Sequence, residues 1–377
     1  MRARRVIARA ACLTRPGRFG GPVVVGGMAS RVLVTGLVIA LTGGCAGHGP
    51  ATADSEGPIP GVRLAAAPAA NQPARTAAAQ RLGRAQLDSV DGALAMLERA
   101  AAAVGTPDGD RVARQAFVDA RRAYKHAEYA IETWAPTAAM ALNGPALPKV
   151  ADDEGDRPWR EPEGFQVIEE YLYPEVAPDC AGALVEEVRA TRATLSRVRL
   201  IAAQVTFTDD HHFDGLRREL ARIVSLGLSG FDSPVAKFGV AESADALRGV
   251  RGALAAYARD AMAADSVAFR RLDASLDGAI VALERDTAFM SFDRFDFIVS
   301  HARPAGLALD AVRRALGIHV PAERRLWRAD AATPYEAEAW DPMAFAPTWA
   351  EAPTPERVAL GQALFQDPAL SGDGSRS

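Results

Sequence analysis

The sequence predicts an all-α protein made of two packed helical bundles. Hydrophobic residues make up 49% of its 377 residues, enough for a substantial core, whereas aromatic residues make up only 7%. Alanine is abundant, and valine and isoleucine rarely fall into the alternating runs that are typical of strands. Apolar residues recur instead at helical spacing in one segment after another, and a succession of helices without a strand pattern favours bundles.

The first 45 residues are expected to be a signal segment. The apolar run "VLVTGLVIALTGGC" ends in small residues and Cys45, and it is too short to span a membrane comfortably. The run resembles a bacterial lipobox, with Thr42 in place of the usual leucine, so Cys45 is the expected lipid attachment site. Met28 then fits as the true start, and residues 1–27 would be spurious. A plain secretory signal is the alternative, and both interpretations predict a periplasmic or cell-envelope protein.

Residues 46–76 are expected to form a flexible tether, because they are rich in alanine, proline and glycine and lack a sustained period. A helical domain is expected over residues 77–329. Its first two helices, predicted to be antiparallel, each carry four apolar residues at helical spacing: Leu87, Val90, Leu94 and Leu97, then Phe117, Ala120, Tyr124 and Ala127.

A long loop is expected over residues 135–163, because prolines and glycines interrupt the helical spacing of apolar residues there. A loop of this length inside a compact domain is often functional or a cover. The next segment, "GFQVIEEYLYP", predicts a short helix that opens at Gly164 and that Pro174 closes.

Five more helices are expected, at residues 183–205, 211–228, 244–263, 266–288 and 293–316, with a loop at 230–239. Residues 330–356 lack periodicity and are predicted to be a linker. Its large aromatic residues Trp340, Phe345 and Trp349 are expected either to lie along a neighbouring domain or to pack back on the bundle.

The charge distribution argues against nucleic-acid binding. The formal net charge is −4, but seven arginines precede the first acidic residue, Asp54. Without them, 36 basic residues face 47 acidic ones, a net charge of −11. Such a chain lacks the clustered lysine and arginine that displace counterions from nucleic acid.

Two acidic clusters provide the candidate metal ligands. "AYKHAEYAIETW" contains His126, Glu128 and Glu132, and the two glutamates share a helix face at i, i+4 spacing. "EGFQVIEEYLY" adds Glu169. Because neither cluster contains a second histidine, structural or surface roles are favoured over metal binding for all four residues.

The remaining histidines predict no catalytic site. His211 and His212 are adjacent at an expected helix start, where Asp209 or Asp210 is suited to cap; adjacent helical residues diverge, so a surface position is predicted for both. His301, among apolar neighbours, is expected to be half-buried.

The three cysteines, Cys12, Cys45 and Cys180, are far apart in sequence and form no CxxC or CxxCH motif, and no disulfide framework is expected. No nucleophile-elbow, HExxH, P-loop or dinucleotide-binding motif occurs at a strand–helix junction.

The last 24 residues carry the most specific motif. "TPERVALGQALFQDPALSGDGSRS" resembles the start of the peroxidase domain in the bacterial di-haem cytochrome c peroxidase and MauG-like family, whose pattern here is LGxxLFxDPxLSxDGSxS. In that family the first CxxCH follows, and residues 357–377 would be the beginning of a truncated peroxidase domain.

Upstream segments resemble the long helical region that one branch of this family carries before the peroxidase domain. They are "NGPALP", "EPEGFQVIEEYLYP", "GFDSP" and "FDRFDFI". The helical part also resembles imelysin-like domains, exported bundles of which some are linked to iron. Their GxHxxE motif falls on Gly164, Gln166 and Glu169, so glutamine stands where that family has histidine.

The resemblance implies the amino-terminal part of an enzyme that reduces hydrogen peroxide with electrons from a cytochrome-type donor. The full-length family member would hold two c-type haems, and this chain, which has no CxxCH, is expected to hold none and to be inactive alone. Its expected partners are the missing peroxidase domain or the donor, and the membrane through the lipid anchor. The alternatives are an exported, lipid-anchored, imelysin-like module that binds a partner or a metal, and a structural spacer.

Overall fold

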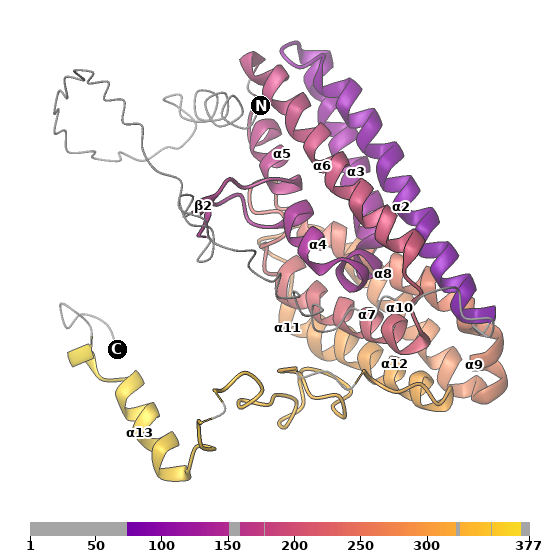
Figure 1. The fold of residues 1–377 in the computed structure, drawn as a ribbon, viewed down its shortest axis with the longest axis vertical. Helices are drawn as coiled ribbons and strands as arrows, with labels where there is room; N and C mark the ends of the chain where they lie inside the picture. The colour runs from indigo at the N-terminus through magenta and orange to yellow at the C-terminus, as the bar shows by residue number, and fades with distance from the viewer. Residues whose placement is uncertain (1–73, 151–158, 177, 322–324, 348, 371–377) are drawn as a thin grey trace, which may run out of the picture.

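The computed structural model describes residues 74–150, 159–176, 178–321, 325–347 and 349–370. The signal segment with Cys45, most of the tether and the last seven residues of the tail lie outside this part. Within it the protein is all-α, as predicted, and the long helices pack side by side in two bundles (Figure 1). The described strands are two short ones, β1 (Lys149–Val150) and β2 (Trp159–Arg160), which pair antiparallel.

The first bundle contains three long helices: α2 (Ala74–Ala101), α3 (Pro107–Trp134) and α6 (Ala181–Gln204). All eight apolar residues that predicted α2 and α3 are buried in its core. The start of α3 follows from its sequence, because Thr106 accepts a hydrogen bond from the Gly109 amide and Pro107 occupies the first helical position. Two short helices, α4 (Pro136–Asn143) and α5 (Phe165–Leu172), pack against this bundle.

The second bundle is built on α7 (Asp209–Arg222), α8 (Gly239–Leu254), α10 (Ser266–Arg285) and α12 (Arg303–Ala315). Short elements extend these helices: the π-helical turn η2 (Ile223–Gly227), the 3₁₀ turn η3 (Ala255–Tyr257), α9 (Ala258–Ala264), α11 (Arg294–Phe297) and the π-helical turn η4 (Ile298–Ala302). A 3₁₀ turn, η1 (Pro178–Cys180), precedes α6 in the first bundle.

Helix α3 joins the two bundles, because it packs on α2 on one side and on α7 and α8 on the other. The buried apolar residues of both bundles form one continuous core. At the crossing of α3 and α8, a Cβ at Gly249 would lie 2.3 Å from the His126 carbonyl oxygen, so the two backbones approach as closely as glycine permits.

Several local expectations were wrong. Residues 136–143 form helix α4 inside the predicted loop, since Pro136 starts a helix that the following alanines favour. Thr208, not Asp209 or Asp210, caps α7, in a reciprocal capping box with His211.

His212 is buried rather than on the surface, edge-on to Trp134. Cys180, in the turn η1, is 3% exposed.

The linker packs back on the bundle in its first part. The ring of Trp327 lies 3.5 Å from the Arg217 guanidinium, and small residues after it are buried: Ala331, Thr333, Ala339 and Ala344. Phe345 and Trp349 remain 71% and 83% exposed.

Beyond the linker, helix α13 (Pro355–Phe365) and the 3₁₀ turn η5 (Pro368–Leu370) contain no buried residue. Helix α13 stands away from the bundles in Figure 1.

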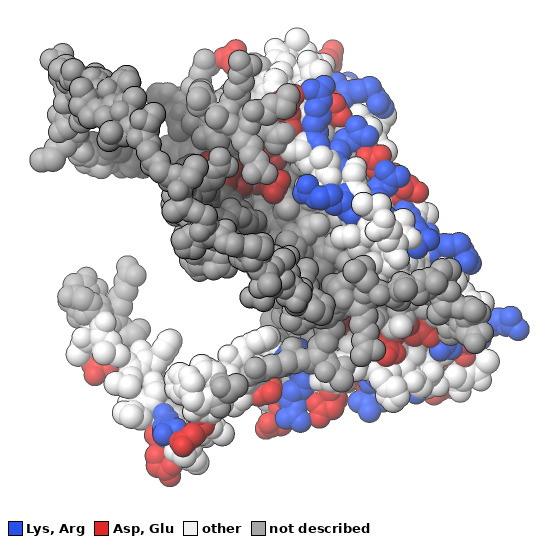
Figure 2. Space-filling view, viewed as in Figure 1, with Lys and Arg blue, Asp and Glu red and all other residues white. Residues whose placement is uncertain are grey.

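The surface over α2 and α6 carries both signs of charge. Figure 2 shows basic and acidic side chains interspersed along this face, and ion pairs join the two helices, among them Arg189 with Glu98 and Arg199 with Asp88. Among the described helices, none is long and apolar enough to cross a membrane.

The α3–α8 crossing makes the first testable prediction. Gly249→Ala is expected to lower the free energy of unfolding by about 2 kcal/mol, because the new methyl group forces the two backbones apart. Gly252→Ala, on the same helix, is the matched control, because its new methyl group would meet no atom within 4 Å, and it is expected to raise the free energy of unfolding by up to about 1 kcal/mol. Urea unfolding measures both, and equal effects of the two substitutions would contradict the close crossing.

Candidate functional site

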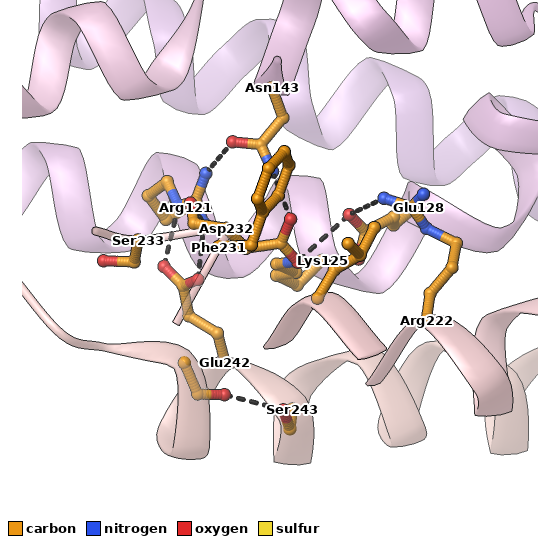
Figure 3. Close-up of polar contacts among 12 residues, drawn as sticks. Arg121, Lys125, Glu128, Asn143, Arg222, Phe231, Asp232, Ser233, Glu242 and Ser243 are labelled. Carbon is orange, nitrogen blue, oxygen red and sulfur yellow. Dashed lines mark hydrogen bonds and ion pairs between the residues drawn. The ribbon is translucent and has the colours of Figure 1, made fainter. Parts of the chain in front are cut away.

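A network of buried charged and polar side chains lies where the two bundles meet. Its members come from α3, the end of α4, α5, α7, α8 and the loop 228–238, as Figure 3 shows for most of them. Nine are at most 5% exposed: Arg121, Lys125, Glu128, Asn143, Gln166, Glu169, Glu219, Asp232 and Glu242. So many buried polar groups require mutual partners, because an unpartnered charge in a protein interior is very costly.

Arg121, on α3, is the most extensively bonded member. Its guanidinium binds Glu242 of α8 with two nitrogens, and its Nε donates to Glu242 Oε1 at 2.7 Å. The same guanidinium donates to the Asn143 side chain and, at 3.0 Å, to the Asp232 carbonyl oxygen. Burial alone would lower the pKa of Arg121, but the Glu242 carboxylate more than reverses this effect, so the guanidinium stays charged.

Lys125 lies one turn further along α3 and bridges two carboxylates. Its Nζ donates to both Glu128 oxygens, at 3.0 and 2.8 Å, and to Asp232 Oδ2 at 2.6 Å. The other Asp232 oxygen accepts from the Asn143 amide at 3.2 Å. Burial opposes the charge on Lys125, but Asp232 and Glu128 together keep its pKa above the usual value.

Helix α5 contributes two side chains that tie the loop to the network. Gln166 donates to the carbonyl oxygens of Asn143 and Phe231, at 3.2 and 2.9 Å. Glu169 accepts from the Ser233 hydroxyl at 2.6 Å and from the Ala236 amide at 2.7 Å.

Gly164 starts α5 at φ +98°, and a side chain there would collide with the last carbonyl groups of α4. The positions of Gln166 and Glu169 therefore follow from the close contact of α4 and α5.

At its other end the network approaches the surface through Arg222. Its Nη2 lies 3.2 Å from Glu128 Oε1 and 2.9 Å from Glu132 Oε1. Glu219 is buried beside this pair, and its carboxyl oxygens accept no hydrogen bond from a described donor. Glu132 and Arg222 line an open groove of about 250 Å³ together with Thr133, Gly215, Arg218, Ala221 and Ser225.

The network contains twice as many carboxyl groups as cations. Three cations, Arg121, Lys125 and Arg222, face six carboxyl groups: Glu128, Glu132, Glu169, Glu219, Asp232 and Glu242. Three carboxyl groups are therefore in surplus.

The pKa values identify the surplus carboxyl groups. Burial raises the pKa of Glu132 to about 7 and raises the pKa of Glu169. Burial and the Glu128 charge raise the pKa of Glu219 well above its usual value. By contrast, Lys125 and Arg222 outweigh burial and lower the pKa of Glu128 to about 2. The raised pKa values of Glu132 and Glu219 indicate that protons take the place of further cations beside these two groups, whereas Glu169 accepts two hydrogen bonds from the 233–236 loop.

The four candidate metal ligands do not converge on one site. Glu128 is held by Lys125 and Arg222, Glu132 by Arg222, and Glu169 by the 233–236 loop. His126 lies in the middle of α3 with its side chain 36% exposed, and its Nε2 is 3.5 Å from Asp245 Oδ1.

Within the described part of the chain, no group of three histidine, cysteine, aspartate or glutamate residues is placed to hold a metal ion. Protein cations occupy the positions beside the carboxylates where a metal would have to lie.

The sequence patterns did not single out Arg121, Lys125, Asn143, Asp232 or Glu242. The segments quoted above for the family resemblance could have indicated the network, because "NGPALP", "EPEGFQVIEEYLYP" and "GFDSP" each contribute side chains to it. No protein-family model matches the chain, and neither does any curated protein.

Arg121→Met is expected to lower the free energy of unfolding by about 3–5 kcal/mol, because it leaves the buried Glu242 carboxylate without its partner. The matched control is Arg122→Met, whose side chain is 55% exposed, with an expected change below about 1 kcal/mol. Replacing Arg121 by Met and Glu242 by Leu together is expected to recover most of the loss. Equal stability of the two single variants in urea unfolding would contradict the role of the network.

The surplus carboxyl groups predict a pH effect of defined sign. Because the pKa of Glu132 is about 7 in the folded chain and near 4.5 when exposed, the folded state binds the proton more tightly, and stability falls as the pH rises from about 4.5 to 7. Glu132→Gln removes this loss, so its stability relative to the parent should rise by up to about 3 kcal/mol over that range.

His212 supplies the opposite control. Burial lowers its pKa to about 4, so its contribution to stability is lost as the pH falls from about 6.5 to 4. The stability of His212→Gln relative to the parent should therefore fall as the pH rises through this window. Urea unfolding at several pH values measures both slopes, and slopes of the same sign would refute the assignment.

Proposed function

We propose that this chain is the amino-terminal helical part of a di-haem cytochrome c peroxidase-like protein, and that it docks the haem-carrying part. That partner would reduce hydrogen peroxide with electrons from a cytochrome-type donor, and its haem iron would supply the chemistry. The helical chain contributes a rigid body and a docking segment. The proposal rests on the tail motif, on the segments that resemble the same family, and on the exposure of the C-terminal segment.

The single observation that supports docking best is the apolar surface of residues 345–370. Large apolar side chains there are between 44% and 83% exposed: Phe345, Trp349, Val358, Leu360, Leu364, Phe365 and Leu370. Contiguous exposed apolar residues of this size are typical of an interaction surface. Helix α13 has Thr354 as its N-cap and Pro355 at its first position, and both favour the start of a helix there.

The bundle itself favours a supporting role. Arg121, Lys125 and Arg222 bind the carboxylates of Glu242, Glu128, Asp232 and Glu132, and among the described residues no group of three histidine, cysteine, aspartate or glutamate side chains is placed to hold a metal ion. We further propose that the lipid on Cys45 and the following tether keep this body at the membrane in the periplasm or cell envelope, where it meets its partner.

The imelysin-like metal-binding module is the alternative function, and the structure offers no specific support for it. Gln166, at the histidine position of the motif, uses its amide to hold two backbone carbonyls. The amide of Gln166 therefore has a structural role, because its two N–H groups fix the backbone at Asn143 and Phe231.

Docking predicts that the purified chain binds a di-haem cytochrome c peroxidase domain prepared without its own helical region, and that the chain alone shows no haem absorption band. Leu364→Ser with Phe365→Ser is expected to weaken binding by roughly tenfold or more in calorimetric titrations, because these side chains supply the apolar contact. The matched control is Phe295→Ser, which changes a 77% exposed phenylalanine on the bundle and should leave binding unchanged.

Two results would contradict the proposal. One is the absence of binding by the parent chain, and the other is equal weakening by the Phe295 control. A stoichiometric, tightly bound metal in the purified chain would favour the alternative function instead.

A further inference from the structure

A second cluster of buried charge lies between α7, α12 and the first part of the linker. It surrounds a small cavity of about 20 Å³, whose lining includes Phe213, Arg217, Leu309, Arg313, Trp327 and Tyr335. This volume corresponds to one water-sized occupant. Trp327 and linker residues 332–335 form one wall of the cavity, so a group bound in the cavity would contact the start of the linker.

Arg217 is the central residue of this cavity, and its hydrogen-bonding capacity is only partly used. Its side chain is 5% exposed, and its Nη2 donates at 2.6 Å to each of the carbonyl oxygens of Arg328 and Ala331. Its guanidinium also lies 3.5 Å from the centre of the Trp327 ring. Within the described part of the chain, however, Arg217 Nε and Nη1 and Trp327 Nε1 are buried without a hydrogen-bond partner.

Three buried donors around one cavity require an acceptor. Leaving a buried donor unpaired costs about 1–3 kcal/mol, and more when the donor is charged. Arg217 and Trp327 both line the cavity. An acceptor bound in the cavity is therefore the simplest way to satisfy them.

The charge balance around the cavity favours an anion over a neutral acceptor. Asp214 is shared by three arginines, with Arg217, Arg218 and Arg325 at 3.8, 3.2 and 2.5 Å. Asp310 is shared by two, with Arg313 at 2.7 Å and Arg314 at 2.6 Å. Because Arg218 and Arg314 are 43% and 60% exposed, the buried groups among the described residues are the guanidinium groups of Arg217, Arg313 and Arg325 and the two carboxylates, which leaves one positive charge in excess.

The excess of positive charge affects the pKa of Arg217. Burial lowers the pKa of its guanidinium to about 10, and the nearby positive charges of Arg325 and Arg313 act in the same direction, against Asp214 and Asp310. A bound negative charge would relieve both the burial and the repulsion.

We propose that this cavity is a binding site for a small monovalent anion of the size of chloride. The anion accepts hydrogen bonds from Arg217 and Trp327 and thereby holds the start of the linker against α7 and α12. A phosphate or sulfate ion is too large for a space of one water volume. The inference goes beyond the docking function and does not depend on it.

The test uses the full chain in sodium gluconate, with chloride replacing gluconate at constant ionic strength. The thermal midpoint of the parent is expected to rise saturably with chloride, by about 3 °C. Chloride-35 NMR gives a second readout that does not depend on stability, because a bound ion broadens the line and added bromide removes the broadening.

Arg217→Met is expected to abolish both effects. Arg218→Met is the matched control, because it removes the same charge from the next residue, which also pairs with Asp214 but is 43% exposed. This variant should keep the chloride response. If Arg217→Met does not fold, Arg217→Lys retains the charge without the planar guanidinium and is expected to weaken the response by roughly fivefold or more.

Three outcomes would overturn the proposal. Equal midpoints in chloride and gluconate, with no line broadening in the parent, would mean that water fills the cavity. A midpoint that follows all anions alike would be a salt effect only. Equal loss of the response in the Arg217→Met and Arg218→Met variants would place the effect outside this cavity.

Discussion

The bidentate ion pair between Arg121 and Glu242 is the interaction on which the rest of the fold depends most. A guanidinium that is 2% exposed can stay charged only beside a carboxylate. Helices α3 and α8 must therefore pack so that the Arg121 and Glu242 side chains meet in the interior. The same guanidinium fixes Asn143 and the backbone at Asp232, and Lys125 fixes the Asp232 side chain. The registers of α3, α4, α8 and the loop 228–238 are thereby linked.

Each of the two buried clusters has unequal numbers of cations and carboxyl groups, and the excess has the opposite sign in the two clusters. The network around Lys125 and Arg222 has more carboxyl groups than cations, and raised pKa values of Glu132 and Glu219 show that protons make up the difference. The cluster around Arg217 has more cations than carboxylates, and guanidinium groups do not give up protons as readily. A bound anion is the remaining way to balance that charge. In our proposal, the network around Lys125 and Arg222 is therefore balanced by protons, and the cluster around Arg217 is balanced by an anion.

The division between a satisfied interior and an exposed C-terminal segment also has a physical basis. The bundles bury most of their large apolar residues in one continuous core, whereas the large apolar side chains of residues 345–370 stay exposed. The start of helix α13 is favoured by its own N-cap, Thr354. A rigid body with an exposed apolar segment is suited to docking, because the segment is available without any unfolding of the bundle.

The sequence by itself determined the fold class and most helices, because an apolar stripe recurs every three or four residues within one helix and is therefore visible locally. It also placed Glu128 and Glu132 on one face of α3, and both reach Arg222. What that face contacts depends on the tertiary fold, because Arg222 is 94 residues from Glu128, and Glu242 is 121 residues from Arg121. No local pattern encodes such distant partners, so the spacing of the two glutamates could not identify the arginine that binds both of them.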